Sequence, residues 1–308
     1  MFDAVFLVGP TAVGKSVLAA EVAERLDAEI INADAFQIYR GADILTGKPD
    51  AEIQRGVPHH LLGSVPLSEP MSAAKFCEMA SCALAEIRSR GKRAIVVGGS
   101  GLYVRALTHG FDAPPPNPET RLKFNKLSLS EQVSRLTNLD SKLASRIDRR
   151  NPRRVMRALE IASVDRRDGS LRYGQTVPAA AVSAAECYGA ETTTTPGTFL
   201  IRDRDDLYHR INNRVRAMFD QGVVEEVRAL NNIGPTAERA LGLREIRELL
   251  AGEISLDDCV ARIQQATRRY AKRQLTWFRH QSSFPQLNLT TFSHPEAIRA
   301  ISHQFAQG

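Results

Sequence analysis

The sequence has few of the features that mark secreted, membrane-bound or zinc-binding chains. Its 308 residues include four cysteines, none in a CxxC spacing, which disfavours a disulfide framework and a zinc site. No stretch approaches the roughly 18 apolar residues of a membrane-spanning helix, and the first residues lack the charged segment and cleavage site of a signal peptide. We therefore expect a cytoplasmic protein with reduced thiols and no membrane association. Nothing in the sequence requires more than a monomer.

Acidic residues are missing from one long stretch of an otherwise mixed chain. The net charge is +6, but residues 259–295 contain six arginines and lysines and no aspartate or glutamate. Residues 146–167 contain eight arginines against three acidic residues. Positive charge concentrated in two segments favours a polyanionic partner, although two solvated helix faces would have the same composition.

Short apolar segments alternate with helical patterns in the first hundred residues. Segments of strand length lie at 4–8, 29–32 and 94–97, and helical periodicity covers 17–26 and 72–90. This alternation predicts an α/β fold with a parallel sheet, whose functional loops follow the carboxyl ends of the strands. A further strand is expected at 198–201, followed by helices to about residue 280.

The pattern changes after residue 112, where four prolines occur between positions 114 and 118. Residues 119–165 have only helical patterns, and the Ala/Thr-rich residues 176–197 are typical of a connection. We therefore predict a helical insertion domain over 113–197. Residues 1–112 and 198–308 would form the α/β core, with basic helices at its C-terminal end.

Residues 9–16 match the phosphate-binding pattern GxxxxGK[ST] between an apolar strand and a helix, the context that this motif requires. Backbone N–H groups at a helix N-terminus bind phosphate oxygens, Lys15 adds a positive charge, and the Ser16 hydroxyl can hold Mg²⁺. The motif predicts phosphate binding without naming the compound. It comprises Gly9, Pro10, Thr11, Ala12, Val13, Gly14, Lys15 and Ser16, and is called the P-loop below.

Asp34 follows the second predicted strand, so we expect it at the same sheet edge as the P-loop. It could serve as a general base or as an indirect Mg²⁺ partner, or it could simply be a turn carboxylate. The third strand ends in Gly98-Gly99-Ser100, where many P-loop ATPases place an aspartate. Its replacement by Gly-Gly-Ser weakens an ATPase interpretation and allows close substrate approach beside a hydroxyl.

Two further patterns involve basic side chains. Arg210 and Arg214 are four residues apart on a predicted helix and share one face, where they could stabilise a leaving diphosphate or simply be solvated. Over 260–279, apolar residues fall on one helical face and the six basic residues on another arc, which would meet phosphates. His59 and His60 have no metal-ligand spacing and are expected to order a loop or satisfy hydrogen bonds.

Several motifs, in this order, resemble those of the tRNA dimethylallyltransferase (tRNA isopentenyltransferase) family. The resemblance covers nearly the whole chain except 168–197 and the residues after 281, and YAKRQLTWFR is its longest and most specific motif. The matching segments are GPTAVGKS (9–16), DAFQIY (34–39), TGKP (46–49), PHHL (58–61), GGSGLY (98–103), RRVMRALEI (153–161), the arginine pair at 210 and 214, ALGLRE (240–245) and YAKRQLTWFR (270–279).

This resemblance implies a P-loop-kinase-like core and transfer of a dimethylallyl group from dimethylallyl diphosphate to N6 of the adenosine immediately 3′ of the anticodon. It implies that Asp34 is the general base that takes the N6 proton. It also implies that Ser100 lies near the target adenine and Asp34. Lys15, Ser16 with Mg²⁺, and Arg210 or Arg214 would hold the diphosphate.

The resemblance also implies contacts with the anticodon stem-loop of tRNA. The residues expected to make them are Asp34, Ala35, Phe36, Gln37, Ser100, Arg153, Arg154, Arg157, Arg244, Lys272, Arg273, Gln274, Trp277 and Arg279. The sequence departs from the family pattern at Ala35, commonly serine, at Leu243, usually aromatic, and at 148–151 (DRRN). None of these departures removes a catalytic group.

Three other functions would explain part of the sequence. A small-molecule kinase would explain the P-loop and Asp34, but not the basic C-terminal helix. A prenyltransferase acting on free adenine nucleotides would need no RNA clamp, and its relatives tend to have lysine where this chain has Ala35. An RNA-binding module with a degenerate P-loop is disfavoured because Lys15, Ser16 and Asp34 are all intact.

Overall fold

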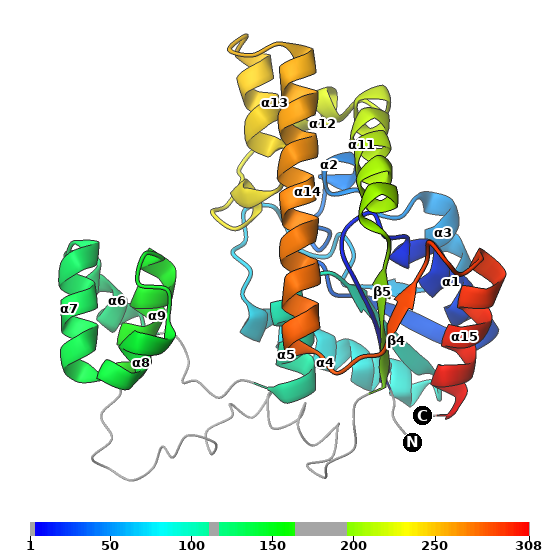
Figure 1. Ribbon diagram of the computed structural model, residues 1–308, viewed down its shortest axis with the longest axis horizontal. Coiled ribbons are helices and arrows are strands. Elements are labelled where there is room, and N and C mark those ends of the chain that lie inside the picture. The colour runs from blue at the N-terminus through cyan, green and yellow to red at the C-terminus, as the bar shows by residue number, and fades with distance from the viewer. Residues whose placement is uncertain (1–3, 111–116, 164–195, 308) are drawn as a thin grey trace. The chain divides into compact units, whose positions relative to one another are not determined.

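The computed structural model describes residues 4–110, 117–163 and 196–307 (Figure 1). Contacts divide the chain into two units, one formed by 1–109 and 183–308 and the other by 110–182. Each unit is described by itself. The predicted domain boundary at 113 and most of the predicted connection at 176–197 lie outside the described residues.

The larger unit contains a parallel sheet, as predicted. Among the described residues its strands follow the order β3-β2-β4-β1-β5-β6, and every neighbouring pair is parallel. The sequence predicted the four central strands but neither short edge strand, because two or three residues are too few for a periodicity. The strands are β1 (Ala4–Val8), β2 (Ala28–Asn32), β3 (His59–His60), β4 (Arg93–Gly98), β5 (Gly197–Ile201) and β6 (Gln286–Asn288).

Two long helices of the larger unit begin at a capping serine. The Ser72 side chain accepts a hydrogen bond from the Lys75 N–H at the start of α4, and the Ser255 side chain accepts one from the Asp258 N–H at the start of α14. None of the helices in the described ranges is long and apolar enough to cross a lipid bilayer. The helices are α1 (Lys15–Arg25), α2 (Asp43–Thr46), α3 (Ala51–Gly56), α4 (Ala73–Ser89), α5 (Gly101–His109), α11 (Arg204–Asp220), α12 (Val223–Ala229), α13 (Leu243–Leu250), α14 (Leu256–Gln281) and α15 (His294–Gln307), with a 3₁₀ turn at Ala237–Arg239.

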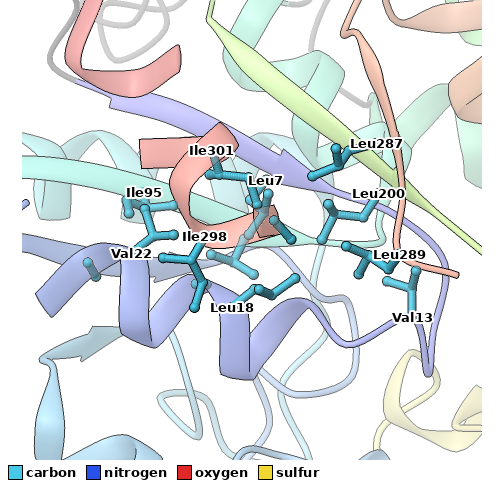
Figure 2. Packing of buried hydrophobic residues seen from close by; sticks show 14 of the residues in the cluster. Leu7, Val13, Leu18, Val22, Ile95, Leu200, Leu287, Leu289, Ile298 and Ile301 are labelled. Atoms are coloured by element: carbon cyan, nitrogen blue, oxygen red, sulfur yellow. The ribbon is translucent and has the colours of Figure 1, made fainter. Parts of the chain in front are cut away.

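The central strands are buried because helices pack against the sheet. Leu7 of β1 and Ile95 of β4 are fully buried against Leu18 and Val22 of α1, and Ile298 of α15 joins the same cluster (Figure 2). Every residue of β1 and β2 is buried; β1 is a continuous apolar run, as expected for a strand covered on both faces, whereas β2 also contains the buried Glu29 and Asn32. This packing fixes the carboxyl ends of the strands, from which the functional loops emerge.

The smaller unit is helical over its described residues, as predicted. Its helices are α6 (Pro118–Phe124), α7 (Leu129–Leu139), α8 (Ser141–Arg146) and α9 (Pro152–Ala162). Ser128 and Glu131 form a capping box at the start of α7. Leu136 and Leu159 are fully buried in a separate apolar cluster, so this unit has a core of its own.

Candidate active site

The P-loop connects the end of β1 to the start of α1, as its motif predicts. Ala12 and Gly14 have positive φ values of 63° and 106°, a conformation that turns successive N–H groups toward one side and is unusual for alanine. Lys15 Nζ lies 3.0 Å from the Gly9 carbonyl oxygen and 2.7 Å from that of Pro10. The ammonium group is therefore held beside the loop.

One cavity of about 420 Å³ brings the predicted phosphate and catalytic groups together. The P-loop forms one wall, Asp34 and Gln37 form another, and Arg210 and Arg214 of α11 contribute to a third. The sequence predicted these residues from segments about 200 residues apart. In the folded chain they line one cavity, which is therefore the candidate active site.

Positive charge dominates this cavity. Burial lowers the pKa of Lys15 to about 8, with the Asp34 carboxylate opposing that shift and Arg214 adding to it. Burial also lowers the pKa of Arg214, again opposed by Asp34. An ammonium and two guanidinium groups thus share the cavity with a single carboxylate, which favours an anionic ligand.

Three arginines from the β5–α11 segment form hydrogen bonds to the P-loop. Arg210 Nε donates to the Ala12 carbonyl oxygen at 3.0 Å, and Arg214 Nη1 lies 3.3 Å from Thr11 Oγ1. Arg202, which the sequence analysis missed, donates from Nε to the Val13 carbonyl oxygen at 2.9 Å. Its position directly after the β5 strand was the available signal, since residues at carboxyl ends of strands converge.

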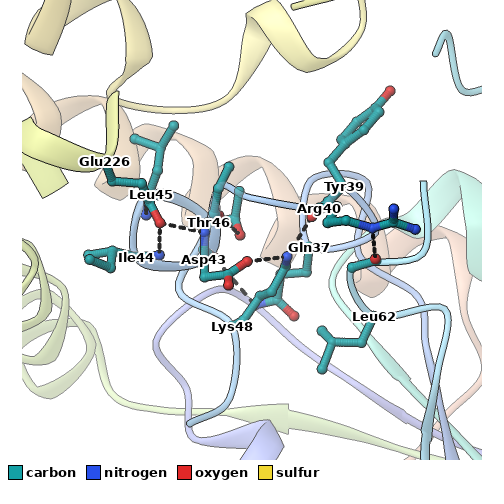
Figure 3. Close-up of polar contacts among 12 residues, drawn as sticks. Gln37, Tyr39, Arg40, Asp43, Ile44, Leu45, Thr46, Lys48, Leu62 and Glu226 are labelled. Atoms are coloured by element: carbon teal, nitrogen blue, oxygen red, sulfur yellow. Dashed lines mark hydrogen bonds and ion pairs between the residues drawn. The ribbon is translucent and has the colours of Figure 1, made fainter. Parts of the chain in front are cut away.

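The loop containing α2 is fixed at both of its ends (Figure 3). The Glu226 carboxylate accepts hydrogen bonds from the backbone N–H groups of Asp43, Ile44 and Leu45 at 2.7–2.9 Å. At the other end, Gln37 Nε2 donates to the Gly47 carbonyl oxygen at 2.8 Å. The loop is therefore a rigid wall of the cavity.

Asp34 makes a turn, as one interpretation of this residue predicted, and it also lines the cavity. Its Oδ1 accepts hydrogen bonds from the backbone N–H groups of Phe36 at 2.9 Å and Gln37 at 3.3 Å. The neighbouring Ala35 N–H donates to Ser100 Oγ at 2.8 Å. The predicted pair Asp34 and Ser100 therefore belongs to one hydrogen-bonded corner between β2 and β4.

A smaller, mostly apolar cavity of about 50 Å³ adjoins this corner. Asp34 and Arg214 border it together with Met218, Ile263 and Tyr270. Tyr270 hydrogen-bonds to Ser100, and burial raises the pKa of its hydroxyl. Tyr270 is not among the residues that the sequence predicted for the site. Its position four residues before Gln274 on the same helix was the signal for a site contact.

The predicted RNA contacts on α14 differ in their exposure to solvent. Lys272, Arg273 and Arg279 are exposed. Trp277 packs against Gly101, where a Cβ would lie 2.3 Å from its ring. Gln274 is only 5% exposed, because the P-loop and the β4–α5 turn satisfy its amide; its predicted contact with RNA stays a prediction.

Other basic residues of the predicted RNA surface already have partners. Arg262 and Arg268 of the basic arc contact the Glu248 carboxylate at 3.0 Å and the Asn212 side-chain oxygen at 2.6 Å. Arg244 is exposed and lies 3.2 Å from Glu248. Fewer basic side chains of α14 are therefore available to an RNA than the composition suggested. Among the described residues, the exposed ones without an acidic partner lie toward the C-terminal half of the helix.

In the smaller unit, Arg153 and Arg154 lie exposed in the first turn of α9, where Asn151 caps their backbone N–H groups. Arg157 donates to the buried Glu160 at 3.1 Å. Its charge is thus partly compensated, whereas those of Arg153 and Arg154 face solvent.

The two adjacent histidines make ordering contacts. His59 Nδ1 lies 2.7 Å from the Val57 carbonyl oxygen, and His60 Nε2 lies 2.7 Å from the buried Glu29 carboxylate. Arg90 donates two hydrogen bonds to the same carboxylate. These contacts tie β2 to β3.

A parallel sheet with this loop at the carboxyl end of its central strand defines a P-loop α/β protein. The sequence profile of the family described as IPP transferase matches residues 37–281. The chain belongs to this family, as its motifs predicted, and it is therefore an enzyme of the transferase class.

Individual relatives agree with this assignment. The chain is 42% identical to tRNA dimethylallyltransferase 1 of Citrifermentans bemidjiense, over 89% of this chain and 88% of that protein. It is 39% identical to the tRNA dimethylallyltransferase of Akkermansia muciniphila, over 95% and 96%.

Solved structures show the same fold. The tRNA isopentenylpyrophosphate transferase of Bacillus halodurans matches with a TM-score of 0.70 and 33% identity, covering 100% of this chain and 96% of that one. A eukaryotic dimethylallyltransferase acting on tRNA matches with a TM-score of 0.77 and 25% identity, covering 99% and 80%. The predicted α/β fold class is confirmed.

Proposed function

We propose that this enzyme transfers the dimethylallyl group of dimethylallyl diphosphate to N6 of the adenosine immediately 3′ of the anticodon in tRNA. The observation that supports this most strongly is the single cavity shared by the P-loop, Arg214 and Asp34. Phosphate-binding groups and a carboxylate must both reach the reacting atoms, and one cavity allows this.

In the proposed reaction, the bond between the first carbon of the dimethylallyl group and the diphosphate oxygen breaks, and a carbon–nitrogen bond to N6 forms. The N6 proton passes to Asp34, so a neutral secondary amine and free diphosphate result. An exocyclic amine is a poor nucleophile, which is why a proton acceptor at that atom helps. The target base must leave its stack to reach Asp34.

Negative charge develops on the diphosphate as its bond to carbon breaks. The P-loop N–H groups, Lys15 and the α11 arginines are fixed before the reaction by the hydrogen bonds described above. Preorganised donors of this kind stabilise developing charge without having to reorient.

Magnesium fits this arrangement. The Ser16 hydroxyl lines the same cavity as Asp34, and Mg²⁺ prefers such oxygen ligands together with substrate phosphates and water. No cluster of three or more histidine, cysteine or acidic ligands occurs among the described residues, so diphosphate oxygens and water would complete its shell. Bound Mg²⁺ would neutralise part of the diphosphate charge.

We assign RNA binding to the exposed Lys272, Arg273 and Arg279 of α14 and to Arg153, Arg154, Arg157 and Arg244. Contacts of arginine and lysine with phosphates position an RNA without reading its sequence. The anticodon stem-loop is the segment that carries the target base. A monomer acting on tRNA in the cytoplasm is sufficient for this function.

The decisive experiment supplies the protein with dimethylallyl diphosphate, Mg²⁺ and undermodified tRNA, with free AMP as the alternative acceptor. Mass spectrometry of the digested RNA should show one dimethylallyl group on the adenosine 3′ of the anticodon. Transfer to AMP but not to tRNA would refute the proposal in favour of the free-nucleotide enzyme. Phosphoryl transfer from ATP to a small molecule would favour the kinase.

A further inference from the structure

Gln274 is a buried polar residue within a basic stretch of α14. The neighbouring Lys272 and Arg273 are exposed, whereas Gln274 points inward and is 5% exposed. A buried amide must have its hydrogen-bonding groups satisfied, because an unpaired one is costly. Its partners therefore show what this residue does.

Both partners belong to the loops that form the catalytic cavity. Gln274 Oε1 accepts a hydrogen bond from the Thr11 backbone N–H at 2.8 Å. Its Nε2 donates to the Gly99 carbonyl oxygen at 2.9 Å. One side chain thus connects the P-loop, the turn that leads to Ser100, and α14.

The turn is shaped to admit this amide. A Cβ at Gly99 would lie 2.2 Å from Gln274 Nε2 and 3.0 Å from the Gly9 carbonyl oxygen. Only glycine leaves room for the amide between the two loops. The close approach explains the second glycine of the Gly98-Gly99-Ser100 turn without invoking contact with substrate.

Thr11 is held from two directions. Its N–H donates to Gln274, and its hydroxyl lies 3.3 Å from Arg214 Nη1. The Gln274 amide oxygen thereby accepts the hydrogen of the Thr11 N–H and fixes the orientation of that peptide group. The N–H groups that follow Thr11 in the P-loop remain available to bind phosphate. Without this acceptor the Thr11 peptide is free to rotate, and the loop loses part of its preorganised shape.

We propose that Gln274 is a positioning residue for the diphosphate-binding loop and not an RNA contact. It holds the P-loop and the Ser100 turn at fixed distances from α14, the helix whose opposite face is exposed and basic. The expected effect of Gln274 on dimethylallyl diphosphate binding rests on the proposed function. Its effect on the order of the P-loop does not.

The test compares Gln274→Met, which keeps the side-chain length but removes both hydrogen bonds, with Thr276→Ala on the exposed face of the same helix. We expect Gln274→Met to weaken binding of inorganic pyrophosphate with Mg²⁺ by about tenfold, the loss for one net hydrogen bond, as measured by calorimetry. The KM for dimethylallyl diphosphate should rise in proportion. The dissociation constant for tRNA should stay within about twofold, and Thr276→Ala should change neither.

A second measurement addresses the loop directly. Hydrogen exchange of the Thr11 amide should be slow in the wild-type protein and faster in Gln274→Met. Fast exchange in the wild-type protein would overturn the proposal whatever the variant does. If Gln274→Met does not fold, Gln274→Asn replaces it, because its neutral amide is one methylene too short to reach both Thr11 and Gly99; unchanged pyrophosphate affinity would then count against the proposal.

The remaining outcomes separate the two proposals. A tRNA affinity that falls tenfold while pyrophosphate binding is unchanged would make Gln274 an RNA contact and refute its positioning role. A wild-type protein that transfers no dimethylallyl group, but whose pyrophosphate binding depends on Gln274, would refute the proposed function alone.

Discussion

Gln37 and Arg214 donate hydrogen bonds to the same two backbone carbonyl groups, those of Thr46 and Gly47. In the proposed reaction, Gln37 belongs to the side of the cavity that receives the adenosine and Arg214 to the side that receives the diphosphate. The α2 loop thus contacts the proposed acceptor and donor sides, and Glu226 holds its other end.

Arg214→Lys tests whether the guanidinium geometry matters. An ammonium group cannot contact the Thr11 hydroxyl and the Thr46 carbonyl group from one rigid plane. We expect the KM for dimethylallyl diphosphate to rise roughly tenfold and kcat to fall about 100-fold, as for loss of an oriented charged donor. Steady-state kinetics with Arg216→Lys, an exposed position on the same helix, provides the control. Equal effects of both substitutions would show that only helix stability had changed.

Asp34→Asn separates proton transfer from turn formation. The asparagine oxygen can still accept from the Phe36 and Gln37 N–H groups, so the corner is preserved while the proton acceptor is lost. Transfer should slow by about 10²–10⁴-fold, the range for removal of a general base, with tRNA affinity within a few-fold. Single-turnover rates and filter binding measure the two effects. Activity near the wild-type level would exclude Asp34 as the base.

Lys272→Ala combined with Arg273→Ala tests the exposed part of α14. Each phosphate contact contributes about one unit to the slope of log affinity against log salt. The double variant should therefore bind tRNA more weakly and with a slope reduced by roughly one to two units. Arg262→Ala is the matched control, because that side chain is already paired with Glu248. The RNA surface would lie elsewhere if the slope of the double variant matched the wild-type slope.

Lys15 provides a pH prediction. Its pKa near 8 in the free protein results first from burial, against the opposing charge of Asp34, with Arg214 adding to the shift. Below pH 8 the ammonium is already formed. Above it, diphosphate binding must restore the proton, so donor affinity should fall by up to about tenfold per pH unit. Lys15→Arg keeps its charge at high pH, and its affinity should lack this decline. Parallel pH curves for the two proteins would remove Lys15 as the titrating group.

Local patterns were sufficient to predict the four central strands, the P-loop, Asp34 and the Arg210–Arg214 pair. Each of these depends on a short motif or on periodicity, and the order of strands and helices brings them to one sheet edge.

The missed features depend on contacts between distant segments. Gln274 is buried although it lies between basic residues, because Thr11 and Gly99 supply its partners from far away in the sequence. Arg202 likewise finds the Val13 carbonyl group only after β5 pairs with β1. A helical wheel contains no information about either partner.

The position of β1 between β4 and β5 has a consequence during synthesis of the chain. A ribosome that has completed the P-loop must add about 190 further residues before β5 and the first turns of α11 emerge, roughly 10–40 s at ordinary elongation rates. Even after β4 has paired with it, β1 keeps one open edge until β5 is made, and Arg202, Arg210 and Arg214 do not yet exist. The nascent chain therefore cannot assemble its diphosphate site until about two thirds of it has been translated.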